Sequence, residues 1–190
     1  MKFCSHCGAG NLNWRIPEGD NRSRYVCEQC GIVHYQNPKI VAGCILEWQG
    51  RVLLCRRAIQ PRYGLWTLPA GFMENGEGAV AAAQREALEE ANAVGEDLQL
   101  YGVYSLPHIS QVYLLYRGVL QGGAASAGEE TLEVELFEEA GVPWGELAFT
   151  VVQDALAHYF PERRAGVFRL HSADIHRDRD GRVSIRRFQC

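Results

Sequence analysis

The stretch GFMENGEGAVAAAQREALEEANA, residues 71–93, decides the fold. Its second half, residues 79–91, is rich in alanine and free of glycine and proline, so it predicts a helix. A loop with Gly76 and Gly78 leads into this helix, and Asn92 stops it. A strand end, a glycine-rich loop and a helix therefore follow one another directly.

Three carboxylates share one side of the predicted helix. At about 100° per residue, Glu86, Glu89 and Glu90 project from one patch, opposite an apolar sector. That sector contains Val80, Ala81, Ala87, Leu88 and Ala91. Like charges four residues apart, and negative charge near a helix C-terminus, are both unfavourable, and Arg85 alone does not neutralise three acids. A hard divalent cation would do so, whereas a solvated acidic face is the plain alternative for this helix taken alone.

Apolar, β-rich runs flank this segment. Residues 39–48 and 51–57 predict a hairpin around the turn at Gln49-Gly50. The run GLWTLPAGF predicts a short strand that ends at Gly71. The remaining expected elements are strands at 98–106, 111–120, 132–137 and 167–171, and a helix at 150–160 ended by Pro161. This order predicts an α/β (α+β) domain with a mixed or mostly antiparallel sheet.

Two copies of one cysteine motif lie near the N-terminus. They are Cys4-Ser5-His6-Cys7-Gly8 and Cys27-Glu28-Gln29-Cys30-Gly31. In each copy the two thiolates share a tight turn, and the glycine permits the positive φ that points backbone N–H groups at sulfur. Two such pairs suit one tetrahedral, structural Zn²⁺, which so short a segment needs in order to fold. Two redox pairs are the alternative, but a redox Cys-x-x-Cys would not come doubled.

The composition excludes several classes of function. A formal net charge of −4 argues against nucleic acid as the main partner, because phosphate binding shows as a basic surplus. No uncharged apolar run is long enough to span a membrane, and the N-terminus lacks the apolar core of a signal peptide. The odd count of 7 cysteines fits reduced thiols, with Cys44 and Cys55 as buried apolar residues. We therefore expect a soluble, intracellular protein of the cytoplasm.

The central stretch resembles the Nudix box, G-x5-E-x7-R-E-U-x-E-E-x-G-U, in which U is a bulky aliphatic residue. The residues in register are Gly71, Glu77, Arg85, Glu86, Glu89 and Glu90. Asn92 replaces the last glycine, and asparagine is the next-best residue for a left-handed helix stop. Ala87 and Ala93 replace bulkier residues, which touches no metal ligand. Because carboxylates and spacing match together, the motif is specific.

The resemblance covers about residues 3–160. The doubled cysteine motif, LLCRRAIQPRYGLWTLPAGF before the box, and GEETLEVELF and PWGELAF after it are similar to a subgroup of zinc-ribbon Nudix hydrolases. Plant members of that subgroup act on FAD and ADP-ribose. The resemblance implies a Nudix α/β/α sandwich with a mixed sheet, preceded by a small zinc-ribbon module. The chain would divide into a zinc ribbon (1–36), a Nudix hydrolase domain (37–165) and a C-terminal tail (166–190).

The resemblance also implies a site for Mg²⁺ or Mn²⁺ on the box helix. The metal ligands would be Glu86, Glu89, Glu90 and the carbonyl oxygen of Gly71. Glu77 would brace the loop, and Arg85 would orient a box glutamate. The reaction implied is substitution at phosphorus by water, in which the cation neutralises charge on the diphosphate and lowers the pKa of the water.

The reaction needs a general base as well. The family varies the position of its base, and the candidates here are Glu89, Glu130 and Glu133. Arg56 and Arg57 close the second strand of the expected hairpin. Either arginine could pair with a phosphate or stack on a base, and either could be a plain surface cation.

We expect ADP-ribose or FAD to be cleaved with release of AMP. The Ser-Gln-Pro-Trp-Pro-Phe-Pro-like stretch that follows the box in NADH pyrophosphatases is absent, since this region reads SLPHISQVYLLYRG. In LLCRRAIQPRYG, Gly64 comes too soon after Arg62 for the pattern of coenzyme A hydrolases. Pro107 lies near the position of a proline found in ADP-ribose hydrolases. Hydrolysis of NADH or of dinucleoside polyphosphates is the alternative.

A function of another class is a non-catalytic Nudix-fold module that binds nucleotides or regulates. The intact set of acids argues against it, because a pure binding domain gains nothing from three crowded carboxylates. A homodimer is expected because related diphosphatases often pair, and Trp14, Tyr35 and Trp144 are candidate contact residues. The other expected partner is a small nucleotide substrate, with neither nucleic acid nor membrane.

Overall fold

The computed structural model describes residues 1–188 and divides the chain into two compact units, residues 1–37 and the residues from 38 onward. The last two residues of the expected tail, 189 and 190, lie outside the described residues. Within the described range, none of the helices combines the length and the apolar character that crossing a membrane requires.

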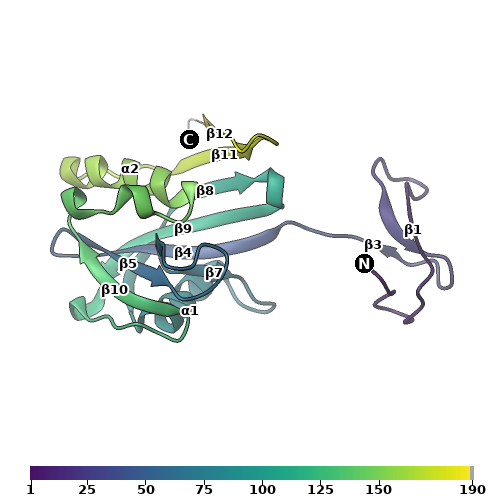
Figure 1. Ribbon diagram of the computed structural model, residues 1–190, viewed down its shortest axis with the longest axis horizontal. Coiled ribbons are helices and arrows are strands. Elements are labelled where there is room, and N and C mark those ends of the chain that lie inside the picture. Colours follow the sequence, from purple (N-terminus) through teal and green to yellow (C-terminus); the bar gives the residue numbers. More distant parts are fainter. Residues whose placement is uncertain (189–190) are drawn as a thin grey trace. The chain divides into compact units, whose positions relative to one another are not determined.

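The first unit is a three-stranded antiparallel sheet, coloured purple in Figure 1. Its strands, in sheet order, are β1 (Leu12–Arg15), β2 (Arg24–Cys27) and β3 (Val33–His34). The glycine after each cysteine pair has a positive φ, +77° at Gly8 and +73° at Gly31. The conformation expected of these two glycines is therefore confirmed.

The second unit contains a nine-stranded mixed sheet. Its main strands, in spatial order, are β10 (Thr131–Phe137), β5 (Arg51–Arg57), β4 (Lys39–Trp48), β9 (Gln111–Leu120), β8 (Gly95–Leu106), β11 (His171–Arg177) and β12 (Val183–Phe188). Two short strands, β6 (Trp66–Thr67) and β7 (Ala70–Phe72), pair with β5 and β4. The pairs β4–β9 and β8–β11 are parallel, which confirms the mixed sheet. The single strand expected before Gly71 is divided between β6 and β7, because Pro69 has no N–H for a ladder.

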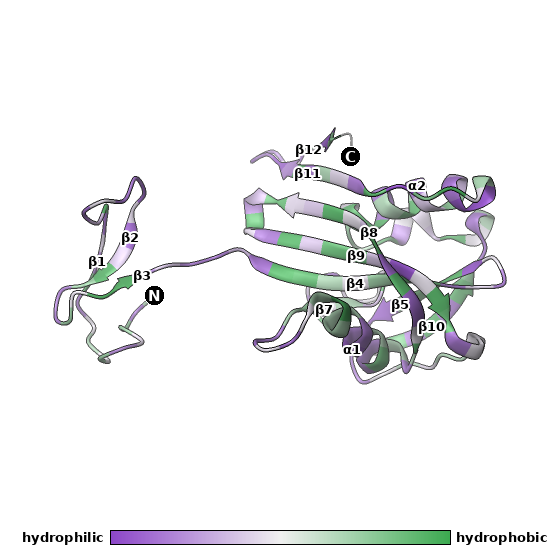
Figure 2. Cartoon of the chain, turned by 180° about the vertical axis from the view of Figure 1, so that it is seen from behind, coloured by the Kyte–Doolittle hydropathy of each residue, from purple (hydrophilic) through white to green (hydrophobic). Residues whose placement is uncertain are grey.

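Two helices cover opposite faces of this sheet, as Figure 1 shows. They are α1 (Ala79–Ala91) and α2 (Thr150–Ala165), and short 3-10 helices lie between other elements: η1 (Pro107–Ile109), η2 (Gln121–Gly123), η3 (Glu139–Gly141) and η4 (Trp144–Glu146). Because successive side chains of a strand point to opposite faces, Val41 and Ile45 of β4 join the core under α2, whereas Cys44 joins the core under α1. Figure 2 shows the hydrophobic colouring of this central strand. The expected α/β/α sandwich is confirmed.

Helix α1 turns a different face to the sheet than its pattern predicts. The buried residues of the helix are Ala82, Ala83, Glu86, Ala87, Glu90 and Ala91. Val80 and Leu88, expected in the apolar sector, are 48% and 52% exposed. Of the expected apolar sector only Ala87 and Ala91 are buried, because the stripe of alanines lets the helix approach the strands closely and the largest side chains stay outside. As a result Glu86 and Glu90 are buried, at 8% and 7% exposure.

Helix α2 runs past the proline that was expected to end it. Pro161 lies inside the helix, which continues to Ala165. A proline in a helix removes a single N–H donor, and here the later turn still forms. The stop is Gly166, in the left-handed conformation at φ +68°, where the Val167 N–H donates to the Glu162 carbonyl oxygen. The expected helix end at residue 160 is wrong.

The residues beyond α2 form a hairpin, where the sequence predicts a single strand at 167–171. Strand β11 pairs in parallel with β8, and β12 pairs with β11. Polar contacts hold the hairpin to α2, since His171 Nε2 lies 3.0 Å from Glu162 Oε1 and the Arg187 guanidinium donates to the buried Asp154 carboxylate. The segment expected to be a tail thus supplies an edge of the sheet.

Candidate functional site

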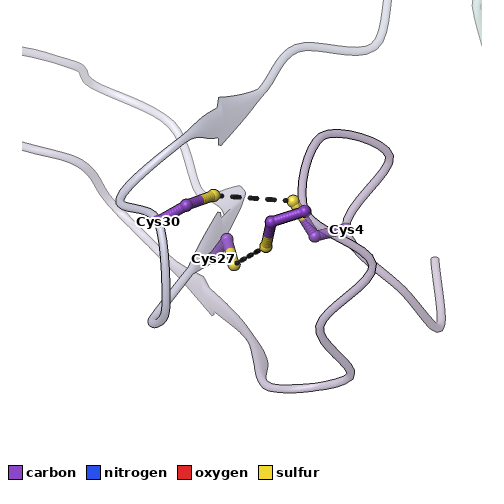
Figure 3. A group of neighbouring side chains, drawn as sticks. Cys4, Cys27 and Cys30 are labelled. Atoms are coloured by element: carbon purple, nitrogen blue, oxygen red, sulfur yellow. Dashed lines mark hydrogen bonds between the residues drawn. The ribbon is translucent and has the colours of Figure 1, made fainter.

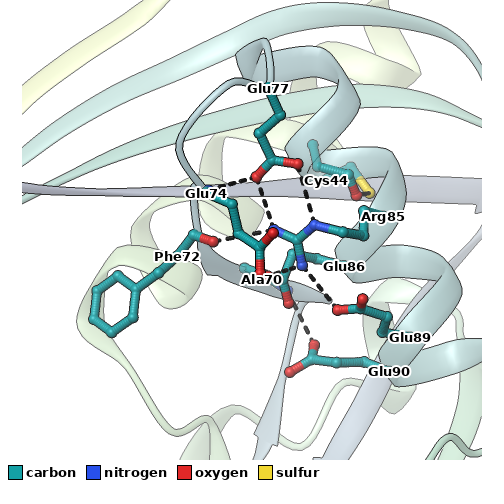
Figure 4. Close-up of polar contacts among 10 residues, drawn as sticks. Cys44, Ala70, Phe72, Glu74, Glu77, Arg85, Glu86, Glu89 and Glu90 are labelled. Carbon is teal, nitrogen blue, oxygen red and sulfur yellow. Dashed lines mark hydrogen bonds and ion pairs between the residues drawn. The ribbon is translucent and has the colours of Figure 1, made fainter.

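Arg85 is the centre of the box, and its guanidinium uses all five of its N–H donors (Figure 4). Its Nε and Nη2 donate to the two carboxylate oxygens of Glu77, at 3.1 and 2.9 Å. Its Nη1 donates to Glu86 and to Glu89, both at 2.8 Å. Nη2 also donates to the carbonyl oxygen of Phe72 at 3.1 Å. One cation therefore ties the end of β7, the loop and two turns of α1 together.

Glu77 is the acid on the loop side of this network. Besides the two bonds from Arg85, its Oε1 accepts the N–H of Glu74 at 2.6 Å. The bonds from Arg85, and then the N–H of Glu74, lower the pKa of Glu77, so its carboxylate stays charged. The neighbouring Gly76 and Gly78 allow the loop many backbone conformations, and the ion pair between Glu77 and Arg85 stabilises one of them.

Glu86 and Glu90 are buried acids that face β7. The N–H of Ala70 donates to Glu90 Oε2 at 3.0 Å. Burial raises the pKa of Glu90 to about 7, and it also raises the pKa of Glu86, where Arg85 partly opposes it. Two buried carboxylates that repel each other are stabilised by a nearby cation. Together with Glu89 they offer hard oxygen donors on neighbouring turns, which fits a divalent metal ion.

Gly71 lies directly against the Glu86 carboxylate. A Cβ at this position would lie 2.3 Å from Glu86 Oε2, so no side chain fits unless the acid moves. Gly71 does not have a positive φ, and the requirement for glycine is therefore one of space. The missing side chain lets the end of β7 pack on the buried acids.

Asn92 ends α1 in the left-handed conformation, at φ +46°, as expected for an asparagine in place of glycine. Its side-chain amide donates to the carbonyl oxygens of Ser126 and Ala127. In return, the Ser126 N–H donates to the Ala91 carbonyl oxygen at 2.8 Å. The loop after β9 is thereby attached to the C-terminal end of the box helix.

The same loop brings Glu130 to the box and leaves Glu133 outside it. The Gly128 N–H donates to the Glu90 carbonyl oxygen at 3.0 Å. Two residues later, Glu130 lies near enough for its charge to add to the effect of burial on the pKa of Glu90. Glu133 lies on β10, where its Oε1 accepts a hydrogen bond from Arg56 Nη1 at 3.0 Å on an exposed surface.

A cleft of about 1360 Å³ opens beside the box. Gly71, the three box glutamates and Glu130 line part of it. Other lining residues come from the loop at 59–62, from η1 and the start of β9, from the N-terminal turn of α2, and from the hairpin of β11 and β12. The volume exceeds the range of about 300–1,000 Å³ that is typical of small-molecule sites, so there is room for a ligand with two large groups.

Arg57 lies in this cleft and is held there by two contacts. Its Nε donates to the Pro61 carbonyl oxygen at 3.0 Å, and its guanidinium lies over the ring of Phe149, 5.2 Å from the centroid. Burial raises the pKa of Glu90, and the charge of Arg57 opposes that effect. Of the two candidate arginines, the structure brings Arg57 to the box and leaves Arg56 in its surface pair.

Several lining residues of the cleft escape sequence reasoning. They are Tyr113, Phe149, Thr150, Ile175, Arg177 and Val183. None belongs to a motif. The apolar ones are expected in the core of any domain, and Thr150 and Arg177 have no spacing that marks them as functional. The usable signal for the C-terminal hairpin is the apolar–polar alternation of SADIHR, residues 172–177, which is typical of a strand.

The four motif cysteines form a separate cluster in the first unit (Figure 3). The sulfurs of Cys4 and Cys30 are 3.7 Å apart, those of Cys7 and Cys27 are 3.6 Å apart, and all four lie within 4.8 Å of one another. Four Zn–S bonds of about 2.3 Å at tetrahedral angles would separate the sulfurs by about 3.8 Å. The backbone N–H of Cys30 lowers the pKa of Cys27 to about 7, which favours the thiolate that a metal needs. The cluster therefore fits one zinc ion.

Models of two known protein families match this chain. A zinc-ribbon model described as Nudix N-terminal matches residues 2–36, and the NUDIX domain model matches residues 37–140.

Among curated proteins, the ADP-ribose pyrophosphatase of Methanocaldococcus jannaschii is 32% identical over 121 residues, which are 60% of this chain and 69% of the relative. The NAD-capped RNA hydrolase NudC of Photobacterium profundum is 24% identical over 167 residues. That alignment takes in 83% of this chain but 59% of the relative.

Among solved structures, a NUDIX hydrolase from Nitrosomonas europaea has a TM-score of 0.89 and 54% identity, and the match covers 93% of this chain and 100% of that one. The NUDIX domain of Shewanella oneidensis NrtR, complexed with ADP ribose, has a TM-score of 0.57 and 21% identity. It covers 70% of this chain and 90% of that chain, and at this identity it shows the fold alone.

Replacing Gly71 by alanine tests the close packing of β7 on the acids. Gly71→Ala places its Cβ 2.3 Å from Glu86 Oε2, whereas Gly78→Ala, in the same box, meets nothing within 4 Å. We expect Gly71→Ala to lower the free energy of unfolding by about 1–3 kcal/mol, as overpacking does, and Gly78→Ala to change it by less than about 0.5 kcal/mol. Urea unfolding of both variants measures this, and equal stabilities would contradict the packing argument.

Proposed function

The chain belongs to the Nudix hydrolase family, and on that premise we propose that it hydrolyses the diphosphate bond of a nucleoside-diphosphate derivative, ADP-ribose or FAD, with release of AMP. The observation that carries the proposal is the set of buried box carboxylates around Arg85, open to a cleft with room for a ligand with two large groups.

We propose that the box holds Mg²⁺ or Mn²⁺. The ligands are Glu86, Glu89, Glu90 and the carbonyl oxygen of Gly71. When bound, the cation neutralises charge on the diphosphate and lowers the pKa of the attacking water. Arg85 positions two of these acids through its bonds to Glu86 and Glu89, and Glu77 holds Arg85 in turn. Arg57, beside the acids, binds a phosphate oxygen.

We propose Glu130 as the general base. It lines the cleft and lies near the buried acids, so it can accept a proton from a water held at the box. Glu89 is less suitable because Arg85 already donates to its carboxylate at 2.8 Å. Glu133 is paired with Arg56 on the surface of β10.

Support for ADP-ribose and FAD as substrates comes from several sides. A relative with 32% identity is an ADP-ribose pyrophosphatase, and Pro107 begins η1, which supplies His108 and Ile109 to the cleft. The stretch after the box that is typical of NADH pyrophosphatases is absent. NADH or a dinucleoside polyphosphate is the second candidate, since NudC relatives match as well.

We propose that the cysteine cluster binds one structural Zn²⁺. Four thiolate donors leave no open coordination position for catalysis. A unit of 37 residues is also too small to fold on an apolar core alone, so metal binding supplies its stability.

Two further expectations stay predictions. The homodimer is one of them. Trp14 and Tyr35, two of its expected contact residues, are 58% and 64% exposed and so are accessible to a partner. The other is the non-catalytic module, which the substrate experiment below distinguishes from an enzyme.

Replacing Glu130 tests the general base. Glu130→Gln keeps the shape of the side chain but removes its basicity, so we expect kcat to fall by about 10²–10⁴. The matched control Glu133→Gln, three residues further along the chain, should stay within about twofold of the unaltered protein. Steady-state kinetics with ADP-ribose measures both, and an equal loss in the two variants would refute the assignment.

A substrate panel tests the reaction and the metal together. We expect kcat/KM for ADP-ribose and FAD to exceed that for NADH by about a hundredfold. Each factor of ten corresponds to about 1.4 kcal/mol, and the loss of a few contacts with the substrate costs this much. Removal of divalent metal with EDTA should abolish turnover, and added Mg²⁺ or Mn²⁺ should restore it. NADH cleaved as well as the others would refute the substrate, and no AMP from any compound would favour the non-catalytic module.

Elemental analysis tests the zinc site. Purified protein that has never met a chelator should contain about one zinc per chain, and Cys27→Ser should lose it. The control Cys44→Ala removes a thiol that is buried in the core of the other unit, so it should keep its zinc. An absence of zinc in the unaltered protein would overturn the proposal.

A further inference from the structure

The C-terminal hairpin presents three residue pairs on the face that packs toward α2. In an antiparallel ladder, opposed side chains point to the same face, and the face alternates with every residue. The pairs on this face are Ala173 with Arg187, Ile175 with Ile185, and Arg177 with Val183. Ala173 and Ile175 belong to the core on the α2 side, which sets the direction of the row. Arg177 and Val183 continue this row past the end of the core.

The first two pairs hold the hairpin in place. Arg187 donates to the carboxylate of Asp154 on α2, whose side chain is 3% exposed. Ile175 is buried, and Ile185 packs against the same core. Because these contacts anchor the hairpin, the third pair has a defined position at the rim of the cleft.

The third pair faces the cleft. Arg177 and Val183 both line it, and both are exposed. Unlike Arg187, which has a partner on α2, Arg177 forms no side-chain hydrogen bond or ion pair within residues 1–188. Its N–H donors are therefore available to a ligand.

The hairpin lies well away from the box across the sheet. Strand β7, where the box begins, pairs with β4, and β9 and β8 separate β4 from β11. From β7 to β11 there are four strand spacings of about 4.8 Å, which amount to about 19 Å. A diphosphate held at the box is much shorter than this, so a ligand reaches Arg177 only through a group attached to the diphosphate.

We propose that Arg177 and Val183 form a specificity wall for that attached group, an inference that rests on the proposed diphosphatase function. Arg177 donates hydrogen bonds to its hydroxyl or carbonyl oxygens, as a nucleoside or sugar presents them, and Val183 packs against it. The wall lies outside the NUDIX domain match, which ends at residue 140. The attached group keeps its place while the diphosphate reacts, so it makes these contacts equally in the bound substrate and in the transition state. Such uniform binding increases affinity and leaves turnover unchanged.

Two arginine variants of the full chain test the wall. Arg177→Ala should raise KM for ADP-ribose and for FAD by about tenfold, which corresponds to about 1.4 kcal/mol, and should leave kcat within about twofold. Arg179→Ala removes the same charge from the exposed turn between β11 and β12, outside the cleft lining, and should change neither constant. Both variants should melt at the temperature of the unaltered protein.

Other outcomes separate this inference from the proposed function. If the unaltered protein turns over and the two variants have equal KM values, the wall is refuted and the diphosphatase function stands. A lower kcat at unchanged KM, or a lower melting temperature for Arg177→Ala alone, would also refute it, because either indicates a structural effect. If the unaltered protein cleaves neither substrate, the proposed function and the wall fail together.

Discussion

The burial of two acids between α1 and β7 is the constraint on which the rest of the second unit depends. Glu86 and Glu90 are almost covered, and burying a carboxylate costs several kcal/mol unless it is compensated. Arg85 compensates Glu86 but makes no bond to Glu90, whose pKa burial raises to about 7. The protein alone therefore leaves part of the negative charge unbalanced. This deficit costs stability, and the divalent cation proposed for the box would balance it.

Small residues around the acids follow from the same constraint. Helix α1 contacts the sheet through alanines, which lets Glu86 and Glu90 reach β7, and its larger apolar side chains are exposed to solvent. Gly71 on β7 and Gly128 on the later loop lie on the helix so closely that a Cβ would collide with the Glu86 carboxylate or the Glu89 carbonyl oxygen. The substitution of Ala87 for a bulkier family residue belongs to this set, because Ala87 is itself buried against the strands. The close approach of backbone on both sides leaves the carboxylates little freedom to move.

The sequence predicts those features whose residues lie close together along the chain. The box and the doubled cysteine motif place their side chains within one loop and helix, or within two turns, so position along the chain determines position in space. It fails where tertiary packing decides. The buried face of α1 follows the alanines and the acids, which a hydrophobic sector cannot indicate. One case is Pro161, which is tolerated inside α2. Another is the hairpin at 171–188, whose arginines make the sequence resemble an exposed tail, although one of them pairs with a buried aspartate on α2.

The two ends of the cleft follow from different physical requirements. At the box, ADP-ribose, FAD and NADH offer the same diphosphate, so the carboxylates and Arg85 cannot distinguish one from another. Discrimination has to come from contacts with the attached groups, and a hundredfold preference needs about 2.7 kcal/mol, the worth of two or three good hydrogen bonds. The box acids face β7, which pairs with β4, whereas Arg177 lies on β11, a strand that the domain match does not include. Under the role proposed for Arg177, the C-terminal hairpin can change in sequence, and the substrate with it, while the packing that buries the acids stays intact, because different segments supply the two ends.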